Sequence, residues 1–177
     1  MITTSDPEVA RKARMIRNQG MEKRYANEFV GLNNRMTDIH ASIGRVQLGK
    51  LAGWTKTRQD NAAFLSQNIT EAVTPTVPES YVHVYHQYTI RVEGATGEER
   101  DRFVTALKEE HQVGSGVYYP IPNHRLPSLA PYAPGLELPN TEKVAAECVS
   151  LPVHPSLSQA DLERIAEAVN KAAKAGA

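Results

Sequence analysis

The chain has 177 residues, in which 20 Lys and Arg balance 20 Asp and Glu, and 41% of the residues are hydrophobic. This composition is typical of a globular protein with its own core, and it excludes disordered and fibrous classes. A formal net charge of zero leaves no broad basic surface, so we expect no nucleic acid partner. One cysteine excludes a disulfide scaffold, and no apolar run reaches the ~20 residues of a membrane helix. We therefore expect a cytoplasmic protein with no membrane contact.

The N-terminal segment predicts one helix followed by a connecting loop. Asp6 is a suitable N-cap, Pro7 is tolerated at the first helical position, and helix-forming residues continue until Gly20 stops them. Residues 1–4 are typical of the end of a strand. Residues 21–35 combine Asn, Gly and charged residues without a clear periodicity, which favours a connecting loop.

A second, much longer helix is predicted from Thr37 onward. Thr37 and Asp38 supply a cap and an acid in the first turn, and apolar residues then keep helical spacing over about thirty residues. Gly44, Gly49 and Gly53 lie inside this pattern, although each glycine costs up to ~1 kcal/mol relative to alanine in a helix. Their presence implies close packing or a bend.

The middle of the chain predicts two strands separated by a helix. Residues 82–92 alternate between apolar and polar side chains, which predicts a strand with His86 and Tyr88 in the sheet core. Residues 96–99 form a capping box for the helix that follows. Residues 113–119 then predict a second strand.

The C-terminal third predicts a long loop followed by three short elements. Residues 120–139 contain more than half of the chain's eleven prolines, which predicts an ordered but irregular loop. Residues 141–147 predict a helix, residues 148–153 a strand, and a capped helix follows from Ser158. The order of elements predicts an α/β or α+β fold with helices packed on a sheet.

The common catalytic and metal-binding motifs are either incomplete or absent in this sequence. Residues 44–51 match a phosphate-binding G-x-x-x-x-G-K loop, but Leu51 replaces the Ser or Thr that ligates magnesium, and the match lies within the long helical pattern. His83 and His86 point to opposite faces of the predicted strand, so they cannot share an ion, and no zinc spacing occurs. Cys148 lies in an apolar run and is expected to be an inert core residue. Single motifs therefore indicate no reaction and no metal.

Four segments of the chain carry a more specific signal when they are taken together. They are residues 31–48 (GLNNRMTDIHASIGRVQL), 83–88 (HVYHQY), 118–124 (YYPIPNH) and 151–158 (LPVHPSLS). In order and spacing they resemble the DegT/DnrJ/EryC1/StrS family of sugar aminotransferases, and the similarity covers nearly the whole chain. The opening residues also resemble the stretch that follows the family's Glu-Gly-Gly turn.

The resemblance implies a fold, a cofactor and partners. The fold would be the C-terminal part of the aspartate aminotransferase fold (type I), an α/β or α+β small domain whose small antiparallel or mixed sheet has flanking helices and one long spanning helix. Residues 1–35 would be the tail of the large cofactor-binding domain with a connecting loop, and residues 36–177 the small domain beginning with the long helix. The family uses pyridoxal 5′-phosphate (PLP) and moves an amino group from glutamate or glutamine to a nucleotide-linked keto sugar. A homodimer is also implied.

The resemblance assigns roles to four residues. Asn33, in the family's G-x-N-x-R motif, would reach across the dimer interface to the cofactor phosphate of the other subunit, where its carboxamide NH₂ is a suitable donor. Arg35 would either steady the loop or meet substrate anions. Tyr118 replaces the first histidine of the family's H-Y-x-P-x-x-H loop at the substrate mouth. His124, which keeps the last position of that loop, would either contact the sugar or nucleotide or hold the proline-rich turn.

One essential group of the family has no counterpart in this sequence. The Schiff-base lysine lies shortly before the residues that match Met1, and none of the eight lysines here occupies the matching place. PLP chemistry needs that lysine as covalent partner and proton shuttle, so we expect no catalytic residue in the chain and no activity of the chain alone. Two interpretations stay open. The chain is either the C-terminal part of a complete aminotransferase or an autonomous, non-catalytic binding or scaffolding protein derived from the family.

Overall fold

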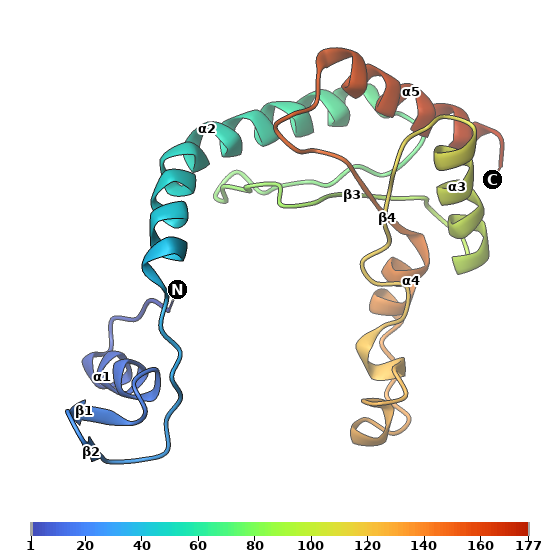
Figure 1. Ribbon diagram of the computed structural model, residues 1–177. Helices are drawn as coiled ribbons and strands as arrows, with labels where there is room; N and C mark the ends of the chain where they lie inside the picture. Colours follow the sequence, from blue (N-terminus) through green and yellow to red (C-terminus); the bar gives the residue numbers. More distant parts are fainter. Residues whose placement is uncertain (1, 177) are drawn as a thin grey trace. The chain divides into compact units, whose positions relative to one another are not determined.

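A computed structural model describes residues 2–176 of the chain (Figure 1). The chain divides into two compact units, Met1–Lys50 (the first unit) and Leu51–Ala177 (the second unit). The boundary between the units falls inside the long helix α2 (Asp38–Asn68). The expected division of the chain between a large and a small domain stays a prediction.

Helix α1 (Pro7–Ile16) begins where the sequence predicts it. The Asp6 carboxylate accepts hydrogen bonds from two backbone N–H groups of the first turn, which have no partner within the helix itself. The chain leaves the helix through Gly20, which has a φ of 75° and donates its N–H to the Met15 carbonyl at 2.8 Å. Residues 2–4 are irregular, so the expectation of a strand end there is wrong for the described residues.

A short hairpin occupies part of the segment that was expected to be a plain loop. Strand β1 (Met21–Lys23) pairs antiparallel with strand β2 (Ala26–Asn27). Tyr25, in the turn between them, has a φ of 65°. Strands of three and two residues are too short to produce a recognisable alternation in the sequence.

The first unit is held together mainly by polar contacts. Among its described positions Met15 is the one buried hydrophobic residue, with 2% of its surface exposed. Arg11 pairs with three carboxylates, those of Glu8 at 2.9 Å, Glu22 at 3.0 Å and Glu28 at 3.8 Å. Its hydrogen bond to Glu8 lowers the pKa of that carboxyl to about 2. Exposed ion pairs contribute little to stability, so this unit has a weak core of its own.

Helix α2 confirms the predicted long helix, with 31 residues. Thr37 caps it, because its Oγ1 accepts the backbone N–H of His40 at 3.3 Å. The helical backbone over residues 44–51 lacks the free loop that a phosphate-binding motif requires. Within residues 2–176 no helix, α2 included, combines the length and the apolar character needed to cross a membrane.

The first half of α2 exposes an apolar surface. Four large side chains that precede residue 50 are between 54% and 73% exposed, namely Ile39, Ile43, Val46 and Leu48. A Cβ atom added at Gly44, Gly49 or Gly53 would meet nothing within 4 Å. Of the two alternatives expected at these glycines, close packing is therefore absent from the described residues, and a bend stays a prediction.

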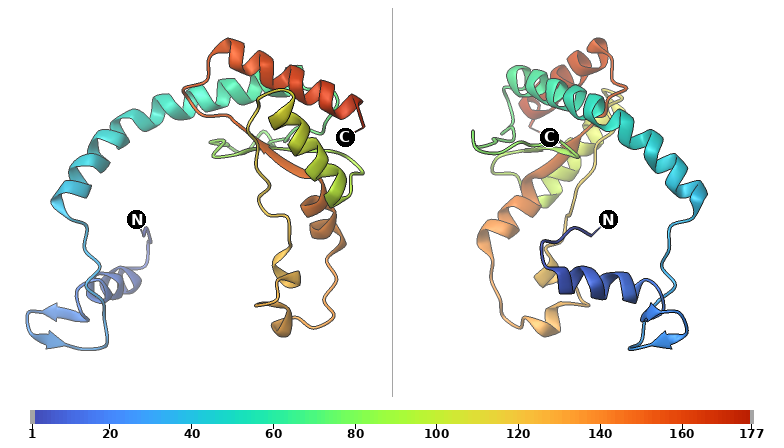
Figure 2. Two further views of the ribbon diagram at one scale, coloured as in Figure 1. Left: turned by 45° about the vertical axis from the view of Figure 1, so that its right-hand side comes forward. Right: turned by 90° about the vertical axis from the view of Figure 1, so that its left-hand side faces the viewer.

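The second unit contains a continuous hydrophobic core. Strand β3 (Tyr88–Arg91) pairs antiparallel with strand β4 (Cys148–Leu151). Helix α3 (Gly97–Glu109), helix α5 (Gln159–Lys174) and the C-terminal part of α2 contribute to the same cluster, and α5 lies alongside that part of α2 in every view (Figures 1 and 2). The large side chains that are fully buried in this core are Leu65, Tyr88, Ile90, Phe103, Leu107, Val149 and Val169. The predicted burial of Tyr88 is thus confirmed.

Two helices of this core start at capping boxes; the sequence predicts the first as a box and the second as a capped start at Ser158. Thr96 accepts the N–H of Glu99 through its side chain, and the Glu99 carboxylate accepts the N–H of Thr96 at 2.8 Å. Ser158 and Asp161 make the same reciprocal pair at the start of α5. Each box satisfies donors that the helix itself leaves unpaired.

The strand predicted over residues 82–92 is much shorter in the structure. Residues 82–87 form no strand, and the segment is held instead by side chains of α2: Gln59 donates to the His83 carbonyl at 3.0 Å, and Arg58 to the Tyr85 carbonyl at 3.2 Å. Alternation alone misled the prediction, because this segment has no partner strand among the described residues. His86 is exposed, so its expected place in the sheet core is wrong.

The strand predicted over residues 113–119 is also wrong. A single bridge forms there, in which Gly116 and Ser150 exchange two backbone hydrogen bonds of 3.0 and 2.7 Å. The proline-rich segment that follows is irregular, as expected, with two short 3₁₀ turns, η1 (Asn123–Arg125) and η2 (Ala130–Tyr132). It leads into helix α4 (Pro139–Glu147), which confirms the predicted short helix.

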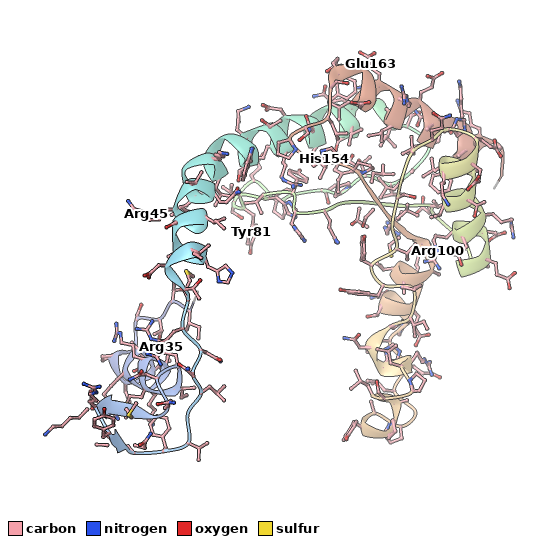
Figure 3. All side chains as sticks on the ribbon, viewed as in Figure 1. Arg35, Arg45, Tyr81, Arg100, His154 and Glu163 are labelled. Atoms are coloured by element: carbon pink, nitrogen blue, oxygen red, sulfur yellow. The ribbon has the colours of Figure 1, made fainter. Side chains whose placement is uncertain are left out.

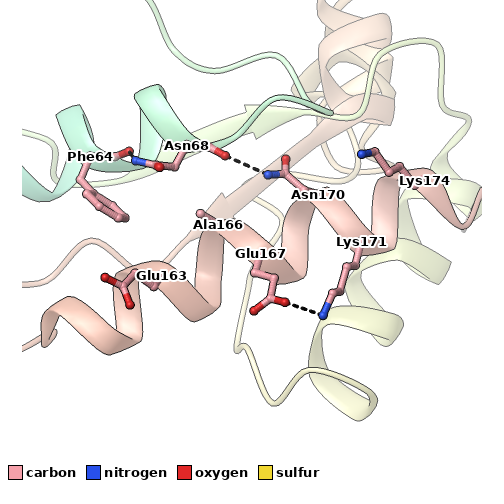
Figure 4. Close-up of a pocket in the computed structure, with 8 residues that line it drawn as sticks. All are labelled: Phe64, Asn68, Glu163, Ala166, Glu167, Asn170, Lys171 and Lys174. Carbon is pink, nitrogen blue, oxygen red and sulfur yellow. Dashed lines mark hydrogen bonds and ion pairs between the residues drawn. The ribbon is translucent and has the colours of Figure 1, made fainter.

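The junction between α2 and α5 contains a surface hollow that has a structural explanation (Figure 4). Asn170 accepts the N–H groups of Thr70 and Glu71 at 2.8 and 3.2 Å and donates to the Asn68 carbonyl at 2.8 Å. These bonds satisfy backbone groups at the C-terminus of α2. We therefore interpret this hollow as part of helix packing.

Candidate functional site

The loop that carries Asn33 is fixed by backbone contacts against the end of α1. Asn33 pairs with Asn18 in an isolated antiparallel bridge, and the N–H of the next residue, Asn34, donates to the Arg17 carbonyl at 3.0 Å. Both contacts lie within the first unit. The position of Asn33 is thus set by contacts inside the first unit.

The glycine of the G-x-N-x-R motif has a steric role in this loop. A Cβ atom on Gly31 would lie 2.1 Å from the backbone nitrogen of Gly20, and a Cβ atom on Gly20 would lie 1.8 Å from the Phe29 carbonyl oxygen. No side chain fits at either distance, so two backbone segments can approach only because both residues are glycine. Asn33 follows this contact by two residues.

The structure brings Asn33 and Arg35 together. The Nε and one terminal NH₂ of Arg35 both donate to Asn33 Oδ1, at 2.8 and 2.5 Å. Both residues are exposed, and Arg35 lies on the strand-free segment that leads from β2 to α2 (Figure 3). The carboxamide NH₂ of Asn33 is the kind of donor that a phosphate oxygen accepts.

Arg35 also lines a small hollow together with two arginines of α1 and the arginine that follows this helix. The hollow has a volume of about 320 Å³, and Arg11, Arg14 and Arg17 contribute to its wall together with Glu22. Arg11 is already paired with carboxylates, so the excess of positive charge at the hollow is that of the other three guanidinium groups, and it suits an anionic group. The sequence analysis missed Arg14 and Arg17, although their spacing of three residues on a helix places them on one face.

Tyr118 and His124 line one cleft in the second unit. The cleft has a volume of about 730 Å³, and its other walls include Tyr119, Val144 and Cys148. Tyr118 is 53% exposed at this cleft, whereas the side chain of His124 is 5% exposed. The structure thus brings these two residues to one cavity, while their contact with a substrate stays a prediction.

His124 is anchored by a carboxylate of α4. Its Nε2 lies 2.8 Å from Glu142 Oε1, which also accepts the Arg125 guanidinium at 2.8 Å. The hydrogen bonds from His124 and Arg125 lower the pKa of Glu142 to about 2. This pattern favours the structural alternative for His124, which ties η1 to α4. The sequence analysis missed Glu142, because it lies eighteen positions after His124, beyond a largely irregular segment.

Metal ligands do not gather in the part of the chain that the structure describes. Over residues 2–176, no three side chains of His, Cys, Asp or Glu converge closely enough to hold a metal ion. The available chemistry is therefore that of donors to anions in the first unit and of an aromatic and apolar cleft in the second.

Comparisons with known proteins give this chemistry a context. The model of the DegT/DnrJ/EryC1/StrS aminotransferase family matches residues 1–170. A pleiotropic regulatory protein of Geobacillus stearothermophilus is 36% identical, over 96% of this chain and 45% of the relative. The dTDP-3-amino-3,6-dideoxy-alpha-D-galactopyranose transaminase of Aneurinibacillus thermoaerophilus is 33% identical, over 96% of this chain and 46% of the relative.

A solved structure agrees with the sequence comparison. DesV of S. venezuelae, crystallised in complex with a ketimine intermediate, superposes on this chain with a TM-score of 0.87 at 30% identity, over 97% of this chain and 46% of that chain. The predicted aminotransferase fold is confirmed by this likeness. The chain spans about half the length of the relatives it matches, and it belongs to the DegT/DnrJ/EryC1/StrS aminotransferase family.

Proposed function

We propose that this chain acts as the C-terminal part of a PLP-dependent aminotransferase, which transfers an amino group from glutamate or glutamine to a nucleotide-linked keto sugar. The observation that carries the proposal is the match to the aminotransferase family over residues 1–170. The transaminase of A. thermoaerophilus, named for a dTDP-linked amino sugar, supports a nucleotide sugar as the substrate class.

The residues of the first unit fit the phosphate end of the cofactor. PLP, once bound, supplies an electron sink for the amino transfer. Asn33 contributes a neutral donor, and Arg35, which bonds to it, lines a hollow with an excess of positive charge; each feature suits a phosphate group. In the proposed homodimer, the carboxamide of Asn33 donates to the phosphate of the cofactor held by the other subunit.

The covalent attachment of the cofactor belongs, in this proposal, to a lysine outside the 177 residues. By the resemblance to the family, none of the eight lysines of the sequence takes the place of the Schiff-base lysine. Lysines elsewhere on the chain lack the pre-organised placement that the covalent bond to the cofactor requires, so they do not replace it. The chain alone is therefore expected to be inactive.

The cleft of the second unit is proposed to lie at the substrate mouth. Tyr118 and Tyr119 expose aromatic surface there, which suits a sugar or a nucleotide base. His124 has the role of holding the loop through Glu142, and Tyr118 has the role of direct contact.

A titration of the purified chain with PLP tests the main claim. We expect neither PLP that survives dialysis nor turnover of a keto sugar with glutamate. Retained, stoichiometric PLP with turnover would overturn the proposal. Sequencing of the genomic DNA upstream of the Met1 codon is the complementary measurement: an in-frame lysine and Glu-Gly-Gly turn support a complete aminotransferase, and their absence supports the autonomous, non-catalytic alternative.

Mixed dimers of the complete enzyme test the intersubunit role of Asn33. One chain carries Asn33→Ala and the other lacks the Schiff-base lysine, so one of the two sites combines the lysine of the first chain with Asn33 of the second. We expect both parent homodimers to be impaired and the heterodimer to regain activity. A heterodimer without recovered activity would refute the contact between subunits.

A further inference from the structure

We propose that Arg35 is a positioning residue, which holds the carboxamide of Asn33 in the one orientation that presents its NH₂ to a phosphate. The inference rests on the proposed function of Asn33 and adds a role for the residue two positions later. It resolves the two alternatives for Arg35 in favour of action through Asn33.

The argument begins with the donors and acceptors of the two side chains. A guanidinium group has donors and no acceptor, whereas a carboxamide has one oxygen and one NH₂. Two Arg35 donors converge on Asn33 Oδ1, at 2.8 and 2.5 Å. A flip of the amide would place its NH₂ against these donors, so the contact allows only one orientation. The NH₂ then points away from Arg35.

The backbone of Asn33 adds to this restraint. Its bridge with Asn18 and the bond from Asn34 N–H to the Arg17 carbonyl fix the main chain on both sides of the residue. The remaining freedom of Asn33 is therefore that of its side-chain torsions. The three staggered wells of χ1 and the two amide orientations give six arrangements, of which the contact with Arg35 selects one.

The expected effect of losing this contact follows from populations. When a binding-competent arrangement is populated by a fraction of molecules, the apparent dissociation constant rises by the inverse of that fraction. Arg35→Ala in the complete enzyme should therefore weaken PLP binding by up to roughly sixfold. Asn33→Ala should weaken it by roughly 10- to 100-fold, as for a lost hydrogen bond to a charged group.

A double-mutant cycle separates positioning from direct attraction of the anion. If Arg35 acts through Asn33, the variant Asn33→Ala/Arg35→Ala binds PLP as weakly as Asn33→Ala alone, within about twofold. If Arg35 meets an anion directly, the two losses multiply instead. Arg14→Ala is the matched control for charge, because Arg14 lines the same hollow and makes no hydrogen bond to Asn33 among those that the structure describes; any loss that it causes should multiply with that of Asn33→Ala.

A spectroscopic measurement on the 177-residue chain gives a second readout. The Asn33 side-chain NH₂ should show a distinct pair of ¹H,¹⁵N resonances, which moves toward the position of a free carboxamide in Arg35→Ala and stays in place in Arg14→Ala. An unmoved resonance in Arg35→Ala would overturn the inference.

The outcomes distinguish this inference from the function on which it rests. Unchanged PLP affinity in Asn33→Ala would overturn the role of Asn33 itself, and the positioning role with it. A large loss in Asn33→Ala with no loss in Arg35→Ala, or with multiplied losses in the double variant, would overturn the positioning role alone.

Discussion

In the second unit, three helices and a two-stranded sheet share one hydrophobic core, whereas the described part of the first unit buries Met15 alone among its hydrophobic side chains. Burial of apolar surface is the main source of folding stability, so the second unit carries most of it. The loop of Asn33 nevertheless lies in the first unit. Its geometry depends on a backbone bridge and on a close approach of glycines, which are local features.

Most of the folding stability therefore arises in the second unit, whereas the proposed phosphate contact lies in the first unit. A region with few buried apolar contacts opens more easily than a packed core. The four apolar side chains that α2 exposes before residue 50 add to this contrast. Substitutions in the two units should therefore have different readouts.

The largest expected effect is the loss of a core side chain in the second unit. Phe103 is fully buried, and Phe103→Ala should lower the free energy of unfolding by about 3–5 kcal/mol, because it removes apolar contacts and leaves a cavity. Val9→Ala, at a side chain of the first unit that is 48% exposed, should change it by about 0.5 kcal/mol or less. Urea unfolding followed by circular dichroism measures both, and equal effects would contradict the contrast.

A pair of glycine variants tests the local geometry of the first unit. Gly31→Ala forces a Cβ atom to within 2.1 Å of the Gly20 nitrogen, and should reduce local stability by more than about 1 kcal/mol. Gly44→Ala adds a methyl group in open space on α2, and should stabilise the helix by up to about 1 kcal/mol. Hydrogen exchange of the amides in residues 18–34 and 40–50 reports each effect. Unchanged exchange in Gly31→Ala would mean that the close approach is unnecessary.

The smallest expected effect is a loss of folding stability at acid pH, to which one carboxylate in each unit contributes. The pKa of Glu8 and that of Glu142 are each lowered from 4.5 to about 2 by hydrogen-bonded partners. A lowered pKa in the folded state means that the contribution to stability is complete above pH 4.5 and is lost as the pH falls toward 2. Titration of the carboxyl carbons by NMR should place both midpoints near pH 2, and a Glu142 midpoint near 4.5 would show that the bond to His124 is absent in solution.

Local sequence signals predicted the helices well. The caps at Asp6, Thr37, Thr96 and Ser158 each involve residues within three positions of one another, so their effect does not depend on the tertiary structure. Helix α2 was equally clear, because its periodicity extends over many turns.

Strands were predicted less well, because pairing depends on distant residues. The alternation of residues 82–92 continues into a segment without a partner strand in the described structure, while β3 forms only where β4 lies opposite. Gly116 pairs at a single position, so a run of strand-forming residues around it was insufficient.

In the candidate site, too, contacts between residues close in sequence were easier to predict than contacts between distant residues. The resemblance to the family identified Asn33 and Arg35 as candidate residues. Their contact could have been predicted from their spacing, because residues two positions apart on an extended chain have side chains on one face. The anchoring of His124 by Glu142 crosses an irregular loop, for which no periodic pattern exists.

The buried thiol of Cys148 gives the chain an internal reporter. Cys148 is the one cysteine in the sequence, it stands at the first position of β4, and 3% of its surface is exposed. The residue also lines the cleft of Tyr118 and Tyr119, so a bulky thiol reagent can react with it only after that cleft or the strand pair of the second unit opens. The rate of labelling therefore measures that opening directly, without an engineered probe and without a contribution from the first unit.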